Sequence, residues 1–124
     1  MILFDTSVVE AYDPVSDSWI TKKSMPAPRR ALTSSPVNGA IYVIGGCSDN
    51  CELNTVEAYD PTADSWSNKA TMPTGRRELT SSVVNGIIYV IGGWAGGGLT
   101  IVEAYDPLSN TWSVKTPMPT ARWD

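Results

Sequence analysis

The sequence contains no histidine. Without an imidazole, the chain cannot form a Ser-His-Asp or Cys-His catalytic arrangement, use histidine as a general acid or base, or bind a metal through histidine. It also has only one phenylalanine and two cysteines, and no apolar stretch approaches the length that spans a membrane. No segment shows a convincing helical period of apolar residues. These absences exclude several catalytic and metal centres and leave β-structure as the expected secondary structure.

Positive charge is sparse as well. The formal net charge is −4 and the sequence pI is about 4.6. The basic residues occur as scattered pairs, such as Arg29-Arg30 and Arg76-Arg77, rather than as a run. Nucleic-acid binding depends on clustered Lys and Arg that displace counterions from phosphates. We therefore expect neither a nucleic acid nor a membrane as a partner.

One hexapeptide occurs three times. Val-Glu-Ala-Tyr-Asp-Pro stands at Val9–Pro14, Val56–Pro61 and Val102–Pro107, with starting points 47 and 46 residues apart. A fixed period in this range indicates stacked supersecondary units. Repeated units of this kind more often form scaffolds and binding surfaces than catalytic centres.

Each complete repeat opens with a predicted hairpin. Asn38-Gly39 and Asn85-Gly86 each separate two β-prone runs. Asn-Gly is the strongest short hairpin signal, because a type I′ turn needs a positive φ at both central residues. The predicted strands are Ala31–Val37 and Ala40–Ile44 in one copy and Glu78–Val84 and Ile87–Ile91 in the next. The apolar second strand of each pair suits burial on both faces.

Two further strands complete the unit. Gly45-Gly46 ends the hairpin, a loop follows, and Thr55–Tyr59 is predicted as the third strand. The fourth strand is predicted from Trp66 to Met72-Pro73, since proline cannot donate to a ladder. Equivalent signals in the next copy place strands over Thr100–Tyr105 and from Trp112 to Met118-Pro119. The repeat is thus a four-stranded antiparallel meander, and its one length change falls in the loop after Gly-Gly.

The paired glycines, the tyrosines and the tryptophans together resemble kelch repeats. The matching residues are Gly45-Gly46, Gly92-Gly93, Tyr12, Tyr59, Tyr105, Trp19, Trp66, Trp112 and the Met-Pro-X-X-Arg stretches beginning at Met25, Met72 and Met118. The resemblance covers essentially the whole chain. It implies an all-β fold of kelch-type β-propeller blades, in which the first strand of each blade lines a central channel.

The chain holds too few repeats to close a propeller alone. We expect an outer half-blade at 1–24, with an additional strand in Met1–Phe4, blades at 25–71 and 72–118, and the start of a further blade at 119–124. An incomplete ring leaves flanks that neighbouring blades normally cover. Three alternatives remain open: a fragment of a longer protein, copies joined head to tail, or a designed or recently duplicated propeller that assembles as a homo-oligomer.

The positions that differ between copies are the candidate binding residues. In kelch propellers, contacts commonly come from the start of the inner strand and from the loop after Gly-Gly. The resemblance therefore points to Trp94, Arg30, Arg77, Glu78, Cys47 and Trp123, with Ala31 and Asp124 at equivalent positions. Trp94 offers a rigid apolar face, and the arginines could pair with carboxylates of a peptide or sugar acid. The competing interpretation is that Trp94 covers a blade edge and the arginines are solvated.

The two cysteines admit two interpretations. Cys47 and Cys51 lie in one loop and form either a disulfide, which we favour slightly, or two free thiols. The sequence shows no secretory signal, so the expected location is cytoplasmic by default and extracellular if Cys47 and Cys51 are oxidised. Two thiols without histidine make a poor zinc site, and we expect no metal.

The recurring acids favour structure over catalysis. Glu10, Glu57 and Glu103 are equivalent positions in successive repeats, and we expect them to pair with Arg29, Arg76 and Arg122. No residue set argues for catalysis or for a cofactor. The sequence thus predicts a non-enzymatic scaffold that binds a protein or peptide through its loops. The alternative is a fragment of a carbohydrate-active enzyme of the sugar-epimerase type.

Overall fold

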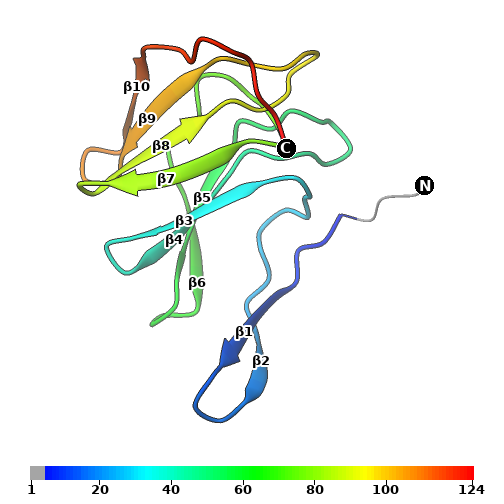
Figure 1. Ribbon diagram of the computed structural model, residues 1–124. Coiled ribbons are helices and arrows are strands. Elements are labelled where there is room, and N and C mark those ends of the chain that lie inside the picture. The colour runs from blue at the N-terminus through cyan, green and yellow to red at the C-terminus, as the bar shows by residue number, and fades with distance from the viewer. Residues whose placement is uncertain (1–4) are drawn as a thin grey trace.

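The computed structural model describes residues 5–124, whose strands form three antiparallel sheets (Figure 1). The first is a hairpin of β1 (Val9–Asp13) and β2 (Ser18–Lys22). The second runs in chain order through β3 (Thr33–Val37), β4 (Ala40–Ile44), β5 (Val56–Asp60) and β6 (Ser65–Asn68). The third runs likewise through β7 (Thr80–Val84), β8 (Ile87–Ile91), β9 (Val102–Asp106) and β10 (Thr111–Lys115). The predicted all-β fold of four-stranded meanders in an incomplete ring is confirmed.

The Asn-Gly pairs form the two inner hairpins. Asn38 and Gly39 have φ values of 51° and 79°, and Asn85 and Gly86 have 50° and 77°. Positive φ at both central residues is what a type I′ turn requires, and asparagine and glycine reach it at little cost. The turn sets the register, so that Val37 faces Ala40 across the first hairpin.

Some strand ends differ from the prediction. β6 ends at Asn68 and β10 at Lys115, short of the Met-Pro pairs, because the chain leaves the sheet; the Met72 N–H donates to the Asn54 carbonyl at 2.8 Å. The inner strands begin later than predicted, after Ala31 and Glu78, whose positive φ values of 53° and 52° interrupt an extended chain. The additional strand predicted in Met1–Phe4 lies outside the described residues.

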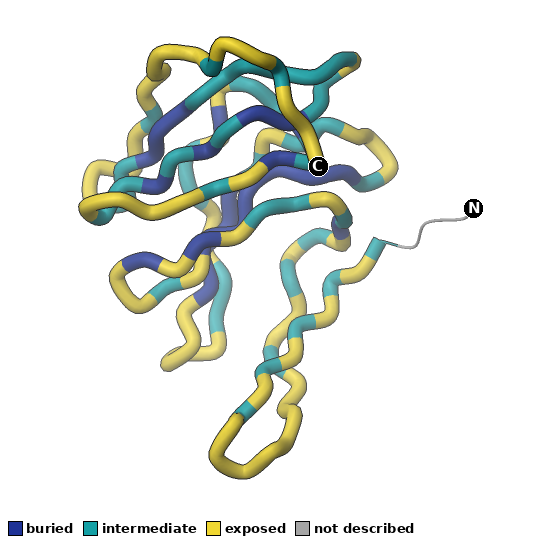
Figure 2. Tube along the Cα trace, viewed as in Figure 1, coloured by how far each residue is buried: buried dark blue, intermediate teal, exposed yellow. Residues whose placement is uncertain are grey.

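The core lies between the two four-stranded sheets (Figure 2). The Tyr42 ring of β4 packs against the Tyr105 ring of β9, with centroids 5.7 Å apart. Ile44 in β4 and Ile88 and Val90 in β8 are fully buried. β4 is buried on both faces over most of its length, as predicted. β8 instead alternates between buried and half-buried residues, because no further described sheet packs on its other face.

Neighbouring sheets are joined by a repeated polar contact. The Trp66 indole N–H donates to the Lys23 carbonyl at 2.9 Å, and the Trp112 indole N–H donates to the Ala70 carbonyl at the same distance. The backbone N–H of the same acceptor residue donates in turn to the next sheet. Its partner is the side-chain Oδ1 of Asp64 for Lys23 at 2.9 Å and of Asn110 for Ala70 at 2.8 Å. Each joint therefore has two hydrogen bonds at its outer edge.

The β1–β2 hairpin projects from the two larger sheets and is mostly exposed (Figures 1 and 2). Tyr12 and Trp19 lie opposite one another across the hairpin, with ring centroids 5.2 Å apart. Tyr12 is 47% exposed and Trp19 is 68% exposed, whereas Tyr59 at the equivalent position is 4% exposed. The hairpin has the sequence of an outer half-blade, and no further strand pairs with it within residues 5–124.

Candidate functional site at the rim of the blades

The Gly-Gly ends of β4 and β8 gather the loops that differ between repeats. At this end, Arg30 and Cys47 exchange two backbone hydrogen bonds of 2.9 and 2.8 Å. Arg77 and Trp94 exchange the equivalent pair at 3.2 and 2.8 Å. Each variable loop is therefore fixed to the segment that opens its own blade. We call this end the rim and define it as residues 29–31, 45–54, 76–78, 92–99 and 121–124.

Three equivalent residues link the blades along the rim. Ala31, Glu78 and Asp124 all have positive φ, at 53°, 52° and 92°. The Glu78 N–H donates to the Ala31 carbonyl at 2.9 Å, and the Asp124 N–H donates to the Glu78 carbonyl at 3.2 Å. The left-handed turn at each position thus creates a chain of hydrogen bonds from blade to blade.

The second glycine of each pair lets the loop lie close against the segment that opens its own blade. Gly46 and Gly93 have φ values of 103° and 104°. A Cβ at these positions would lie 2.7 Å from the Arg30 carbonyl oxygen and 2.8 Å from the Arg77 carbonyl oxygen. Such contacts exclude any side chain unless the backbone moves.

Buried ion pairs lie directly beneath the rim. Arg29 donates to Glu57 and Arg76 to Glu103, each at 2.5 Å, and both guanidinium groups are fully buried. Arg76 also donates to the carbonyls of Thr74 and Val90, at 3.0 and 3.2 Å. The predicted Arg–Glu pairing is confirmed for these two repeats.

The third predicted pair does not form within residues 5–124. Glu10 and Arg122 are both exposed, and neither makes an ion pair with another described residue. By the spacing of the repeat, Arg122 is the equivalent of Arg29 and Arg76, and Glu10 is the equivalent of Glu57 and Glu103.

A cleft of about 270 Å³ opens between the two blades at the rim. The residues that line it are Arg30, Ala31, Cys47, Cys51, Arg77 and Glu78. The structure joins Cys47 and Cys51 by a disulfide, with Cα atoms 4.1 Å apart, so that the bond forms part of the cleft wall. Cys47 is buried and Cys51 is exposed.

Each cleft arginine has a carboxylate beside it. Arg30 pairs with Asp5. Arg77 lies 3.7 Å from Glu52 and 3.7 Å from Glu78. The arginine side chains remain 33% and 27% exposed, so they are neither fully solvated nor buried. A guanidinium has five N–H donors, so each arginine lining the cleft has donors beyond those directed to these acids within residues 5–124.

Two aromatic residues flank the cleft. Trp94 and Trp123 pack edge to face, with ring centroids 5.1 Å apart and an interplanar angle of 66°. Trp123 remains 50% exposed and lines, with Glu78 and Asp124, a second cleft of about 240 Å³. A Cβ on Gly98 would lie 2.3 Å from the Trp123 ring, so the loop after β8 provides a flat bed for this indole.

All six sequence-predicted site residues therefore lie on the rim. Arg30, Cys47, Arg77 and Glu78 share one cleft, while Trp94 and Trp123 stand together beside it. Sequence reasoning did not anticipate Asp5 and Glu52, the acids that face the arginines. Asp5 and Glu52 lie 47 residues apart, which is the spacing of the repeat, so they are equivalent positions and a periodic signal was present. The third equivalent position is Gly98, which lies beside Trp123 instead of an arginine.

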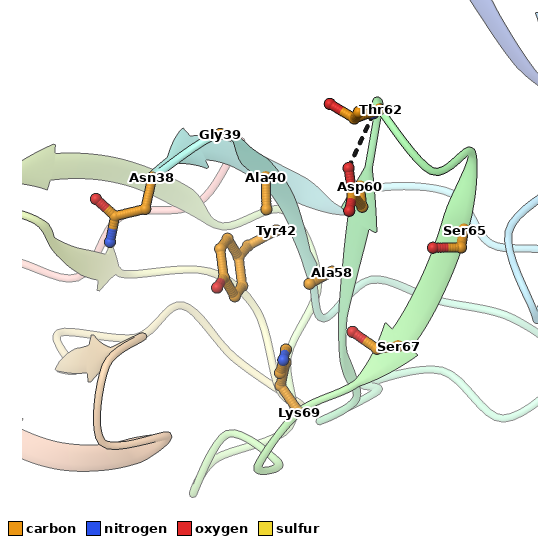
Figure 3. A pocket seen from close by; sticks show the side chains of 10 residues that line it. All are labelled: Asn38, Gly39, Ala40, Tyr42, Ala58, Asp60, Thr62, Ser65, Ser67 and Lys69. Carbon is orange, nitrogen blue, oxygen red and sulfur yellow. Dashed lines mark hydrogen bonds between the residues drawn. The ribbon is translucent and has the colours of Figure 1, made fainter.

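A larger groove, of about 470 Å³, lies at the opposite end of the β3–β6 sheet (Figure 3). Tyr42, Ala58 and Ser67 lie side by side across three strands and form its floor, with Lys69 pointing toward the tyrosine ring. The Asp60 carboxylate at the edge of the groove accepts a hydrogen bond from the Thr62 N–H at 2.8 Å. This groove was not predicted, because its residues alternate as in any half-buried strand.

The repeated tyrosines stabilise the outer turns. Tyr59 donates to Asp64 at 2.6 Å, and this hydrogen bond, with desolvation and nearby acids, raises the pKa of Tyr59 to about 12. The same bond is the main reason that the Asp64 pKa lies below its usual value. The pKa of Tyr105 is also raised to about 12, mainly because burial disfavours the charged form. These groups hold the frame and lie away from the rim.

Two kinds of feature are not found in the part of the chain that the structure describes. No three or more His, Cys, Asp or Glu side chains gather where they could hold a metal ion. No helix there is long and apolar enough to cross a membrane.

Comparison with known proteins finds sequences similar to parts of this chain. Human Kelch-like protein 4 is 43% identical over 47 residues, which are 38% of this chain and 6% of that protein. Kelch-like protein 24 of rat is 40% identical over 38 residues, 31% of this chain and 6% of that protein, and Kelch-like protein 24 of mouse gives the same values. The matched segments thus span only a small part of these relatives.

A solved structure shows the same fold. The structure of YjhT superposes on 93% of this chain and 52% of its own, with a TM-score of 0.76 and 21% sequence identity. This chain therefore corresponds to about half of that one. The family model for the KLHDC2/KLHL20/DRC7 Kelch-repeats domain matches residues 1–123. With blades, paired glycines and aromatic positions in agreement, the chain belongs to the kelch-repeat family.

Proposed function

We propose that this chain is a protein-interaction module that binds a protein or peptide partner through its rim. The observation that carries the proposal is the convergence of the variable residues. The loops of two blades and the C-terminal segment bring Arg30, Arg77, Glu78 and the two tryptophans to one end of a rigid frame. Variable loops on a fixed scaffold are where recognition is usually found.

The chemistry of the rim suits an extended peptide. Arg30 and Arg77, which already lie beside Asp5 and Glu52, have further N–H groups that can donate to a backbone carbonyl or a carboxylate of a ligand. Because an acid already lies beside each arginine, the rim is nearly neutral, and binding there does not require a highly acidic ligand. A peptide with mixed polar and apolar side chains matches this surface best.

The tryptophans supply the apolar part of the surface. Trp123 is half exposed, and its ring is held between Trp94 and the loop at Gly98. A large side chain that is already fixed loses little entropy on binding, which is why tryptophan and arginine dominate the energetics of interfaces.

The test is a selection of displayed random peptides on the purified chain, followed by affinity measurements on rim variants. We expect Trp94→Ala and Arg77→Met to weaken binding by about 2 kcal/mol or more, roughly 30-fold. The matched control is Lys69→Ala, which changes the groove at the other end and should leave peptide affinity unchanged. Circular dichroism of each variant verifies folding.

Two results would contradict the proposal. Selected peptides whose affinity falls with Lys69→Ala but not with the rim variants would move the site to the opposite end. Turnover of a sugar by this chain, in a parallel panel of sugars and sugar acids, would favour the carbohydrate-active alternative over a binding module.

A further inference from the structure

We propose that the Cys47–Cys51 bond is a site of reversible thiol–disulfide exchange, at which a thiolate ligand attacks the sulfur of Cys51. Opening the bond releases Glu52, the next residue, from its contacts with the neighbouring blade. The observation that carries the proposal is an exposed disulfide in the wall of a cleft, in a loop that the next blade closes without cysteine. The proposal does not rest on peptide binding at the rim.

The frame of this loop does not require the disulfide. In one blade the Leu53 N–H donates to the Gly46 carbonyl at 2.9 Å. In the next blade the Leu99 N–H donates to the Gly93 carbonyl at the same distance, although the segment between these two residues contains no cysteine. Because one loop closes in this way without the bond, the other can lose the bond and still keep its fold.

The bond also encloses a very short stretch of chain. Cys47 and Cys51 are separated by four positions in the sequence. A disulfide stabilises a fold mainly by limiting the freedom of the unfolded chain, and this effect grows with the number of residues enclosed. This bond therefore adds less to stability than one that links distant segments, so that its opening is easier to tolerate.

Exposure decides which of the two sulfurs a ligand can reach. Cys47 is 1% exposed, whereas Cys51 is exposed beside the cleft of about 270 Å³. The Nη2 atom of Arg30 lies 3.8 Å from the Cys51 sulfur. Its positive charge attracts an incoming thiolate and stabilises Cys51 when this residue leaves as a thiolate. Asp5 pairs with Nη1 of the same guanidinium, which weakens the effect but leaves the contact with the sulfur in place.

The exchange transfers a bond between sulfurs. The ligand thiolate forms a bond to the Cys51 sulfur, the bond to Cys47 breaks, and its electron pair leaves on the Cys47 sulfur, which takes a proton from solvent. A monothiol stops at this mixed disulfide. With a dithiol, the second thiolate attacks the ligand sulfur of the mixed disulfide, and Cys51 leaves as a thiolate beside Arg30. The two electrons come from the dithiol, which becomes a disulfide.

The carboxylate of Glu52 carries the effect of the bond to the next blade. It accepts the Gly96 N–H at 3.1 Å and lies 3.7 Å from Arg77. Glu52 has a φ of 73°, a conformation that residues other than glycine rarely adopt and that the surrounding structure must hold in place. The disulfide fixes the residue before it. Once the bond is open, Cys51 and Glu52 relax together, and the contacts with Gly96 and Arg77 are lost.

The first test asks which sulfur reacts. The purified chain is incubated with glutathione, quenched with acid, and analysed by intact mass and peptide mapping, and a parallel arm uses dithiothreitol. We expect glutathione to form a mixed disulfide at Cys51 and dithiothreitol to give two free thiols, both in the folded chain. The rates in the two arms show whether the site reacts better with a monothiol or with a dithiol. A bond that opens only after denaturation, or an adduct at Cys47, would overturn the proposal.

Variants of the neighbouring arginine test its part in the reaction. Arg30→Met should slow the reaction with glutathione about two- to fivefold, the effect of a nearby unit charge that water and Asp5 screen. Arg30→Lys keeps the charge and should retain most of the rate. The matched control is Arg77→Met, which removes the same charge from the cleft and should change the rate less than about twofold. Equal slowing by Arg30→Met and Arg77→Met would refute a specific role for Arg30.

The second test follows the link to the next blade by amide hydrogen exchange. In the reduced chain, and in the double variant Cys47→Ser/Cys51→Ser, the Gly96 amide should exchange at least about tenfold faster than in the oxidised chain. The Leu99 amide, which donates within the frame of its own loop, is the control and should not change. An unchanged Gly96 rate would disprove the link. A double variant that fails to fold by circular dichroism would show that the bond is structural and refute the exchange.

Discussion

The buried pair of Arg76 and Glu103 makes the sharpest prediction about stability. Arg76 is 0% exposed and Glu103 is 1% exposed, and the two side chains meet at 2.5 Å. Arg76→Met removes the cation but leaves the carboxylate buried; among residues 5–124, the Thr74 hydroxyl at 2.9 Å is then its remaining side-chain donor. An uncompensated buried charge is expensive, and breaking such a pair costs about 3–5 kcal/mol.

The magnitude is large for a chain of this size. Typical unfolding free energies are about 5–15 kcal/mol, and the exposed flanks of this chain contribute little. Arg76→Met is therefore expected to bring the unfolding midpoint close to zero denaturant. The double variant Arg76→Met/Glu103→Leu removes both charges and should recover most of the loss, since an apolar pair of similar volume is often neutral or stabilising.

The assay is urea denaturation followed by tryptophan fluorescence, at a concentration low enough to keep the chain monomeric. The chain provides its own control at the equivalent position of the next repeat. Arg122 is exposed and unpaired within the described residues, so Arg122→Met should change the unfolding free energy by no more than about 0.5 kcal/mol.

The reasoning would be refuted by an Arg76→Met variant as stable as Arg122→Met. It would also be refuted by a double variant no more stable than Arg76→Met alone, because the loss could then not be assigned to the unpaired carboxylate. Glu103→Gln tests the converse change, and we expect it to be destabilising for the same reason.

Two further predictions concern the frame. Absorbance titration should find that Tyr59 and Tyr105 ionise near pH 12. Because folding raises the pKa of each from 10.0, the stability that the two groups contribute is complete below pH 10 and is lost as the pH rises toward 12. Tyrosines that all titrate near pH 10 in the folded chain would contradict this. Gly93→Ala should lower the unfolding free energy by about 1–3 kcal/mol, because the residue has a φ of 104° and a Cβ would lie 2.8 Å from a carbonyl oxygen. Gly97→Ala, where no atom lies within 4 Å of the added Cβ, is the control, and equal thermal melts for the two variants would disprove the argument.

The frame was predictable because its signals are local and repeated. Asn-Gly demands a tight hairpin wherever it falls between β-prone runs, and the spacing from tyrosine to tryptophan recurs because the two rings face each other across one turn. Strand ends were less predictable. Ala31 and Glu78 look compatible with an extended chain, but each takes a positive φ where the blades are joined by the hydrogen bond between them, which a local pattern does not reveal.

The details of the rim were less accessible from sequence for a different physical reason. Arg30 and Arg77 could be placed at the start of an inner strand, but their partners depend on how loops of different length fold over them. Glu52 reaches Arg77 of the next blade because its loop crosses the joint between sheets, where it also accepts the Gly96 N–H at 3.1 Å. The contact recurs with the repeat, since Asp5 and Arg30 stand 47 residues before Glu52 and Arg77. The spacing alone does not show that a loop of one blade reaches the arginine of the next.

Adjacent residues in each repeat separate stability from recognition. Arg76 is buried and fixed by Glu103, while Arg77, the next residue, faces the cleft with its backbone held by Trp94. The second position can therefore change without loss of the ion pair, and in the following repeat it is Trp123. Because the buried pair and the backbone bonds do not involve the side chain at this position, the rim can present different chemistry on the same frame.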